Sequence, residues 1–188
     1  TLLRLDSEIE IAPLVEAMRS GEVPLEVVDV PTGDGGQLYD RKLILVRTDQ
    51  HVAWRGDAVP ERLQSLVDTL RASLAHMLIS RTGARLQPGT RSYARAWIRD
   101  GAMISEGLLR MGREDAVREY LDWYAPFQFD NGKVPCCVDD RGSDPVPEND
   151  SHGELIFAIA DYARHTGDDA FLAAMWPHVR GAFEYMET

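Results

Sequence analysis

The sequence predicts an α+β composite, with a small α/β module over residues 1–60 and an all-helical domain over residues 61–188. Up to about residue 60, short β-branched runs alternate with one helical stretch. From Glu61 onward, every long periodic segment shows the three- and four-residue apolar spacing of a helix. The first pattern is typical of a small α/β sandwich, and the second favours antiparallel helical hairpins.

The elements of the first module are predicted from short patterns. Apolar residues at helical spacing predict a helix over residues 11–18, and Gly21 ends it. Two apolar runs flank residues 48–50, which predicts a hairpin. The expected strands cover residues 1–5, 25–30, 43–46 and 51–54.

The second domain is expected to contain about five helices. The apolar stripe of the first helix, residues 63–78, runs unbroken through the region where a domain boundary would fall. A long loop over residues 127–150 precedes Ser151 and Glu154, which spell a capping box. Pro177 fits the first position of the last helix. The other expected helices centre on residues 104–111, 117–124 and 151–163.

Composition excludes several classes of protein. The net charge is −11 and no Lys/Arg block occurs, so nucleic acid is not an expected partner. No apolar run approaches the roughly 18 residues that cross a bilayer, and the first residues do not resemble a signal peptide. We therefore expect a soluble, cytoplasmic protein with no membrane partner.

The two cysteines, Cys136 and Cys137, are adjacent. Two thiols without a third or fourth ligand nearby do not make a zinc site, and a vicinal disulfide would strain the peptide. The sequence therefore predicts buried free thiols, no metal and no cofactor.

The densest group of unusual residues is the segment 91–102, directly before a helix. Arg99 and Asp100 can present a guanidinium and a carboxylate together, and Trp97 or Tyr93 can offer a flat apolar face. Such a set suits a sugar ring, whose hydroxyls need polar partners and whose C–H face prefers an aromatic ring. The alternative interpretation makes Asp100 a helix N-cap and Trp97 a core residue.

A second group lies in the long loop and at its exit. Loops of this length are usually functional or disordered, and carboxylates at a helix start can supply an acid, a base or sugar-hydroxyl acceptors. The alternative assigns Glu154 to the capping box and the pair Asp139 and Asp140 to a solvated turn. The group consists of Asp139, Asp140, Asp144, Glu148, Asp150, His152 and Glu154.

Residues from about 70 to 186 resemble the N-terminal part of a six-hairpin glycosidase of the glucoamylase-like (α/α)6 toroid class. In that class, the resemblance implies, the Trp-x-Arg-Asp string lines the subsite that holds the sugar, which corresponds to Trp97, Arg99 and Asp100. The Asn-Asp string faces the same funnel and corresponds to Asn149 and Asp150, with His152 beside them. The strings that carry the resemblance are SYARAWIRDGA (92–102), GKVPCCVD (132–139), PVPENDSHGE (145–154), TGD (166–168) and WP (176–177).

The toroid of this class needs twelve helices, and the sequence predicts about five. We therefore expect a fragment of a carbohydrate-active glycoside hydrolase that carries part of a sugar-binding funnel, with a carbohydrate substrate as its partner. The residues of the family's general acid and base belong to later loops, so the catalytic residues stay unknown and the chain alone is expected to be inactive. A partial toroid leaves apolar helix faces exposed, which allows self-association.

Residues 1 to about 70 resemble the C-terminal thioredoxin-like domain of FAD-dependent aromatic-ring hydroxylases. The strings that carry this resemblance are VPLEVVDV (23–30), LY (38–39) and LILVRTDQHVAWRG (43–56). In that family the domain is not catalytic, and the absence of a C-x-x-C motif agrees with a unit that does no thiol chemistry. The alternative function is therefore a non-catalytic module of a flavin monooxygenase. A third hypothesis is a helical interaction domain without a ligand, whose loop carboxylates point into solvent.

Overall fold

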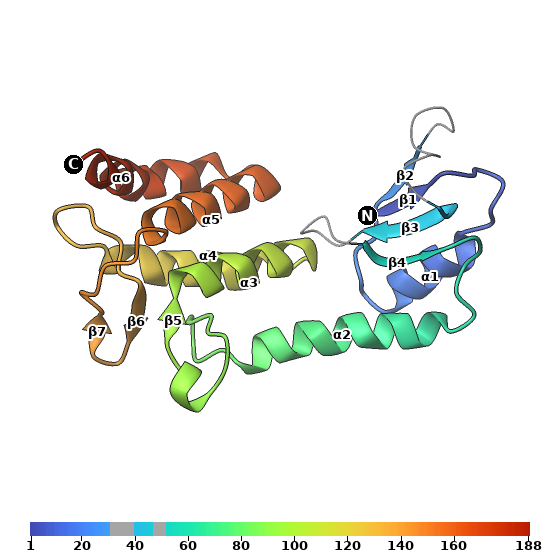
Figure 1. Cartoon of the computed structure of the whole chain (residues 1–188), viewed down its shortest axis with the longest axis horizontal. Coiled ribbons are helices and arrows are strands. Elements are labelled where there is room, and N and C mark those ends of the chain that lie inside the picture. The colour runs from blue at the N-terminus through green and yellow to red at the C-terminus, as the bar shows by residue number, and fades with distance from the viewer. Residues whose placement is uncertain (31–39, 47–51) are drawn as a thin grey trace. The chain divides into compact units, whose positions relative to one another are not determined.

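Figure 1 shows the computed structural model of the chain, which describes residues 1–30, 40–46 and 52–188. The chain forms two compact units, Thr1–Leu74 and Ala75–Thr188. The described residues contain six α-helices and two small sheets, which confirms the predicted mixture of α and β structure. The division between the units lies within helix α2 (Leu63–Ile79), whose apolar stripe is unbroken in the sequence.

The first unit contains a four-stranded mixed sheet in the order β2-β1-β3-β4. Strand β1 pairs in parallel with β2, whereas β3 is antiparallel to both of its neighbours, β1 and β4. The predicted strands are confirmed: β1 and β2 are shorter than expected, β3 has its expected bounds, and β4 ends two residues later. The predicted turn at 48–50 lies outside the described residues. The elements before α2 are β1 (Leu2–Arg4), α1 (Ala12–Ser20), β2 (Val27–Asp29), β3 (Leu43–Val46) and β4 (Val52–Gly56).

The core of this unit forms where the sheet meets α1. Leu2 and Ile44 of the sheet are fully buried, and so is Leu14 of α1. Gly21 follows α1, and a Cβ atom there would lie 2.1 Å from Val67 Cγ1 of α2. The end of α1 can approach α2 this closely only because residue 21 has no side chain.

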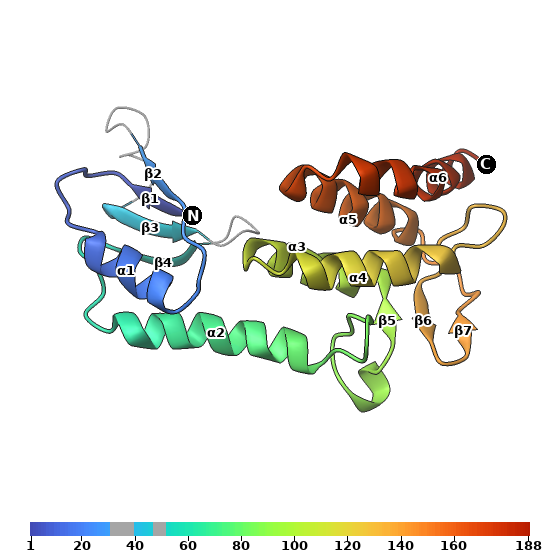
Figure 2. The ribbon, with the colours of Figure 1, turned by 180° about the vertical axis from the view of Figure 1, so that it is seen from behind.

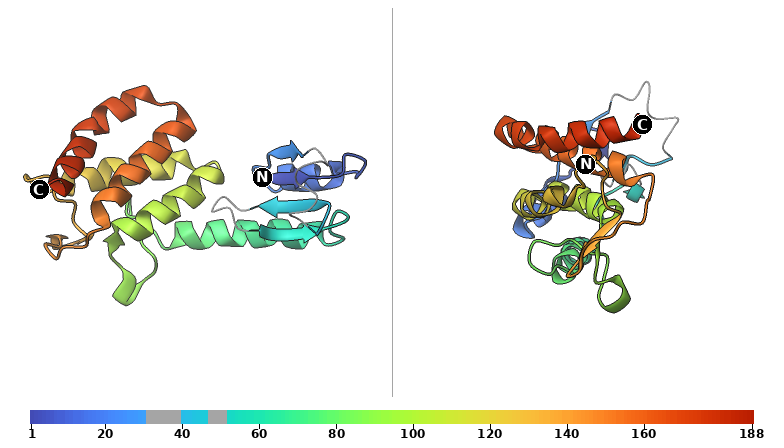
Figure 3. Two further views of the ribbon diagram at one scale, coloured as in Figure 1. Left: turned by 45° about the horizontal axis from the view of Figure 1, so that its top comes forward. Right: turned by 90° about the vertical axis from the view of Figure 1, so that its left-hand side faces the viewer.

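The second unit consists of two helical hairpins and a small sheet (Figures 1 and 2). Helices α3 (Ile98–Arg110) and α4 (Glu114–Tyr124) form the first hairpin, and α5 (Ser151–Thr166) and α6 (Asp169–Met186) form the second. Helix α3 packs along α5, and Figure 3 shows α5 and α6 side by side. Buried apolar and aromatic residues, such as Leu108, Tyr120 and Ile159, fill the space between the helices.

The predicted long loop is not without structure. Strands β6 (Cys137–Asp139) and β7 (Gly142–Ser143) form a hairpin within it, and β6 also pairs with β5 (Ala96–Trp97). This three-stranded sheet places the segment before α3 directly beside the loop that leads to α5. The sheet escaped prediction because its strands are only two or three residues long.

The N-cap roles considered for Asp100 and Ser151 are wrong, although α5 begins at Ser151 as expected. Helix α3 begins at Ile98, so Asp100 lies inside the first turn and is not the N-cap, which is Trp97. The predicted capping box of Ser151 and Glu154 does not form: Asp150 precedes the helix, no side chain caps it, and the buried Ser151 hydroxyl has no hydrogen-bond partner among the described residues.

Helix α6 begins eight residues before Pro177, which lies inside the helix on its exposed side. The Asp168 carboxylate caps this helix by accepting a hydrogen bond from the Phe171 N–H at 2.8 Å. The cap begins the helix well before Pro177, and the carbonyl that the missing N–H of Pro177 leaves without a partner lies on the exposed side, where water can reach it. No helix in the described part of the chain has the length and apolarity needed to cross a membrane.

Candidate functional site

Arg99 joins the two segments that the sequence analysis singled out. Its guanidinium lies in the first turn of α3 and pairs with two carboxylates that precede α5. Arg99 Nη2 is 2.6 Å from Glu148 Oε2, and Nη1 is 2.9 Å from Asp150 Oδ2. Asp100 follows Arg99 in the same turn, half-buried. We call these four residues, together with Trp97, the acidic rim.

Trp97 gives the rim an aromatic surface. It is half-buried in β5, so it is neither a core residue nor fully exposed. Its ring centroid lies 6.5 Å from that of the exposed Tyr93, at an interplanar angle of 52°. The Arg95 guanidinium stands 5.6 Å from the Trp97 ring centroid, a distance typical of a cation–π contact.

The predicted residues Asn149 and His152 lie differently. Asn149 is exposed between the two acids that bind Arg99. His152 is only 5% exposed, and its ring stacks on Tyr185 of α6 at a centroid distance of 4.7 Å. His152 therefore fixes the start of α5 against α6 and presents little surface to a ligand.

Glu154 does not have the capping role that the alternative interpretation of the sequence gave it. It does not cap α5, and burial and the neighbouring Asp150 carboxylate raise the pKa of its half-buried carboxyl group, against the opposing effect of Arg99. A carboxyl group with a raised pKa can hold a proton for transfer to a leaving group. The sequence analysis included Glu154 among the carboxylates that can supply an acid or a base, and the competing capping-box interpretation is wrong.

Acidification is expected to destabilise the helical unit through His152. Burial lowers the pKa of His152, with Lys133 adding to the effect and Asp150 opposing it. In the unfolded chain His152 takes up a proton below about pH 6.5, whereas in the folded chain it does so only at a lower pH. The contribution of His152 to the free energy of unfolding is therefore full above about pH 6.5 and is lost as the pH falls through the folded-state pKa.

The measurement is urea unfolding between pH 8 and pH 5, followed by circular dichroism. Replacing His152 with Gln is expected to make the pH dependence shallower by up to roughly 1.4 kcal/mol per pH unit, the limit for one proton. His76, exposed on α2, provides the control variant His76→Gln. Equal pH dependence in the His152→Gln variant and the parent would contradict the prediction.

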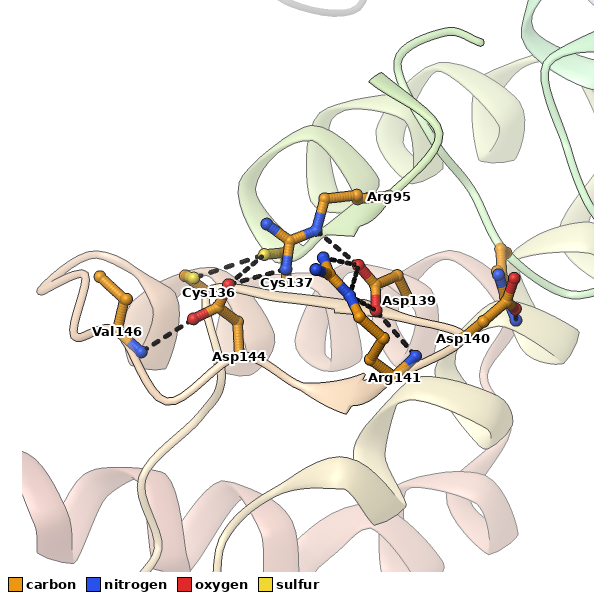
Figure 4. A network of polar contacts seen from close by, with 9 residues as sticks. Arg95, Cys136, Cys137, Asp139, Asp140, Arg141, Asp144 and Val146 are labelled. Atoms are coloured by element: carbon orange, nitrogen blue, oxygen red, sulfur yellow. Dashed lines mark hydrogen bonds and ion pairs between the residues drawn. The ribbon is translucent and has the colours of Figure 1, made fainter. Parts of the chain in front are cut away.

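A second polar network joins Arg95 to the β6–β7 hairpin (Figure 4). Arg95 bridges the carboxylates of Asp139, at 3.0 Å, and Asp144, at 2.7 Å. The guanidinium and the backbone N–H of Arg141 both donate hydrogen bonds to the Asp139 carboxylate. These contacts, together with the charge of Arg95, hold the pKa of Asp139 far below its usual range. The Asp144 carboxylate also accepts a hydrogen bond from the Val146 N–H, which lowers its pKa.

Both cysteines lie in this network as free, buried thiols, as predicted. Their Sγ atoms are 3.5 Å apart, and Cys137 Sγ is 3.8 Å from Asp144 Oδ2. Burial and the neighbouring Cys136 raise the pKa of Cys137 to about 12. The expectation that no third ligand lies near the pair is wrong, because the hairpin returns Asp144 to them.

Two surface hollows are lined by residues outside the acidic rim. One is in the first unit, between Arg4 and Asp29, and the other lies beside the start of the long loop, between Phe129 and Lys133. Comparison with protein-family models, curated proteins and solved structures finds no match to this chain.

Proposed function

We propose that the helical unit binds a pyranose sugar at the acidic rim, as part of the sugar-binding funnel of a glycoside hydrolase. The observation that carries this proposal is the double ion pair of Arg99 with Glu148 and Asp150. It joins two segments about fifty residues apart into one surface, and each of them was singled out independently as a sugar-contacting candidate.

The chemistry of the rim suits a neutral sugar. Carboxylates held by a guanidinium keep acceptor positions free for sugar hydroxyls, and the guanidinium offers donors in a fixed plane. Trp97 and Tyr93 supply apolar surface for the C–H face of the ring. Asp100, Glu148 and Asp150 outnumber Arg99, so the negative charge of the rim disfavours anionic ligands such as phosphates.

The reaction we propose for the parent enzyme is hydrolysis of a glycosidic bond. Such enzymes use one protonated carboxyl group as general acid and one carboxylate on the other side of the sugar. Burial and Asp150 shift the pKa of Glu154 in the direction that a general acid needs, against the opposing charge of Arg99. The antiparallel hairpins α3–α4 and α5–α6 support a partial (α/α) toroid as the fold of this unit.

Sugar titrations of the full chain test the site. We expect glucose, mannose, galactose or N-acetylglucosamine to change the tryptophan fluorescence of the parent, and Trp97→Ala and Asp100→Asn to weaken that binding at least tenfold, about 1.4 kcal/mol. Matched controls are Trp176→Ala and Asp115→Asn, exposed residues of α6 and α4 outside the rim. Isothermal titration calorimetry gives the affinities of variants that lack a tryptophan.

Two results would end the proposal. One is the absence of binding of all four sugars to the folded parent. The other is unchanged affinity in both rim variants, which would place any sugar elsewhere on the chain.

One observation favours a second function for the first unit, a non-catalytic packing module of a flavin-dependent aromatic hydroxylase. Its sheet order, β2-β1-β3-β4 with β3 antiparallel to its neighbours, supports a thioredoxin-like module, and residues 1–74 contain no cysteine for thiol chemistry. The test is binding of the chain to a flavoprotein hydroxylase that lacks its own C-terminal domain. Submicromolar binding supports this function, and failure to associate rejects it.

A further inference from the structure

The pair of cysteines and Asp144 form a compact group of metal-binding atoms. Cys136 Sγ, Cys137 Sγ and a carboxylate oxygen of Asp144 all lie within 4.8 Å of one another. Neighbouring residues of a strand normally point to opposite faces, but β6 begins only at Cys137, which leaves Cys136 outside the strand. Figure 4 shows both sulfur atoms and the Asp144 carboxylate on the same side of the hairpin.

The spacing of these atoms approaches that of a tetrahedral zinc site. Zn–S bonds of about 2.3 Å and Zn–O bonds of about 2.1 Å place two sulfur ligands roughly 3.8 Å apart and a sulfur and an oxygen roughly 3.6 Å apart. The observed separations are 3.5 Å between the two sulfur atoms and 3.8 Å between Cys137 Sγ and Asp144 Oδ2. Side-chain shifts of a few tenths of an ångström bring these two pairs to ligand geometry.

We propose that Cys136, Cys137 and Asp144 bind a thiophilic divalent cation of the zinc class, through two thiolates, one carboxylate and a fourth position open to water. Binding replaces the two thiol protons with one M²⁺ ion, so two protons are released and the charge of the group does not change. Arg95 then faces the same net charge with and without the metal, and its pairing with Asp144 orients the carboxylate as an outer-shell contact.

The two thiols are buried, and backbone hydrogen bonds hold the segments that carry the ligands. Cys136 and Cys137 are 5% and 1% exposed, so little rearrangement of solvent accompanies binding. The Asp144 N–H donates to the Cys137 carbonyl at 2.9 Å, and the Ile98 N–H donates to the Cys136 carbonyl at 3.1 Å. A metal ion here would therefore join the end of β7 to β6 and, through β6, to the start of α3.

Titration of the reduced full chain with Co²⁺, in the presence of a phosphine reductant, tests the proposal. We expect a thiolate-to-cobalt charge-transfer absorption that saturates at one ion per chain, the release of two protons per ion in weak buffer, and displacement of Co²⁺ by Zn²⁺. Cys137→Ser and Asp144→Asn are expected to weaken binding by more than the roughly 10–100-fold loss caused by removing an outer-shell contact.

Asp140→Asn is the matched control, because Asp140 lies on the same hairpin, 88% exposed, and pairs with Arg85. We expect it to bind Co²⁺ like the parent. Absence of the charge-transfer absorption in the folded, reduced parent overturns the proposal, and so does unchanged affinity in a folded Asp144→Asn variant. Circular dichroism establishes that each variant is folded, and none of these outcomes depends on the sugar titrations.

Discussion

Replacement of Gly101 with Ala is expected to lower the free energy of unfolding of the helical unit by about 3 kcal/mol, the upper end of the range for overpacked cores. A Cβ atom on Gly101 would lie 2.0 Å from Tyr120 Oη and 2.4 Å from its Cζ. Tyr120 cannot move away easily, because its side chain is fully buried and its ring lies against Tyr124 at a centroid distance of 5.4 Å. The clash must therefore separate α3 from α4.

Gly153 provides the matched control. It also lies inside a helix, near the start of α5, but a Cβ atom there meets nothing within 4 Å. The gain in helix propensity from glycine to alanine is then expected to stabilise the unit by up to about 1 kcal/mol. Urea unfolding followed by circular dichroism measures both variants. A Gly101→Ala variant as stable as the parent would show that α3 and α4 are not packed as described.

The role of Gly101 also explains why the start of α3 was predicted too late. Apolar periodicity identifies a helix through its large residues, and here it begins at Ile104. The preceding turn buries Ile98 together with Gly101 and Ala102, and the two small residues interrupt the pattern of large apolar side chains because the large side chain at that contact belongs to Tyr120 of α4. The start of α3 is determined by its packing against α4, so the sequence of α3 by itself could not reveal it.

In the candidate site, too, the sequence could identify individual residues but not the contacts between them, because those contacts depend on the fold. Trp97, Arg99 and Asp100 could be selected from the sequence because such groups are uncommon side by side, and Asp150 because it ends a loop rich in carboxylates. The ion pairs of Arg99 with Glu148 and Asp150 depend on the packing of α3 along α5, and the approach of Asp144 to the cysteines depends on a hairpin whose strands span three and two residues. Contacts between separate segments of the chain produce no periodic pattern in the sequence from which they could be predicted.

The long loop is anchored to α6 before it reaches the acidic rim. Gln128 Nε2 donates to the carbonyls of Gly132, at 2.8 Å, and His178, at 3.1 Å, while Gln128 Oε1 lies 3.0 Å from His178 Nδ1. Gly132 has a φ of +87°, and a Cβ atom there would lie 2.2 Å from the carbonyl oxygen of Gly181. Two glycines thus allow the loop backbone to touch the helix backbone.

Substitution of Gly132 with Ala is therefore expected to destabilise the helical unit by about 3 kcal/mol, combining left-handed backbone strain of roughly 1–2 kcal/mol with the clash against α6. Gly142→Ala separates the two effects, because Gly142 has a φ of +97° but open space around the added atom. We expect only the strain cost there. Urea unfolding compares the pair, and equal losses would mean that the loop backbone does not touch α6. A larger loss in Gly132→Ala, accompanied by weaker sugar binding, would indicate that this anchor holds Glu148 and Asp150 in place for Arg99.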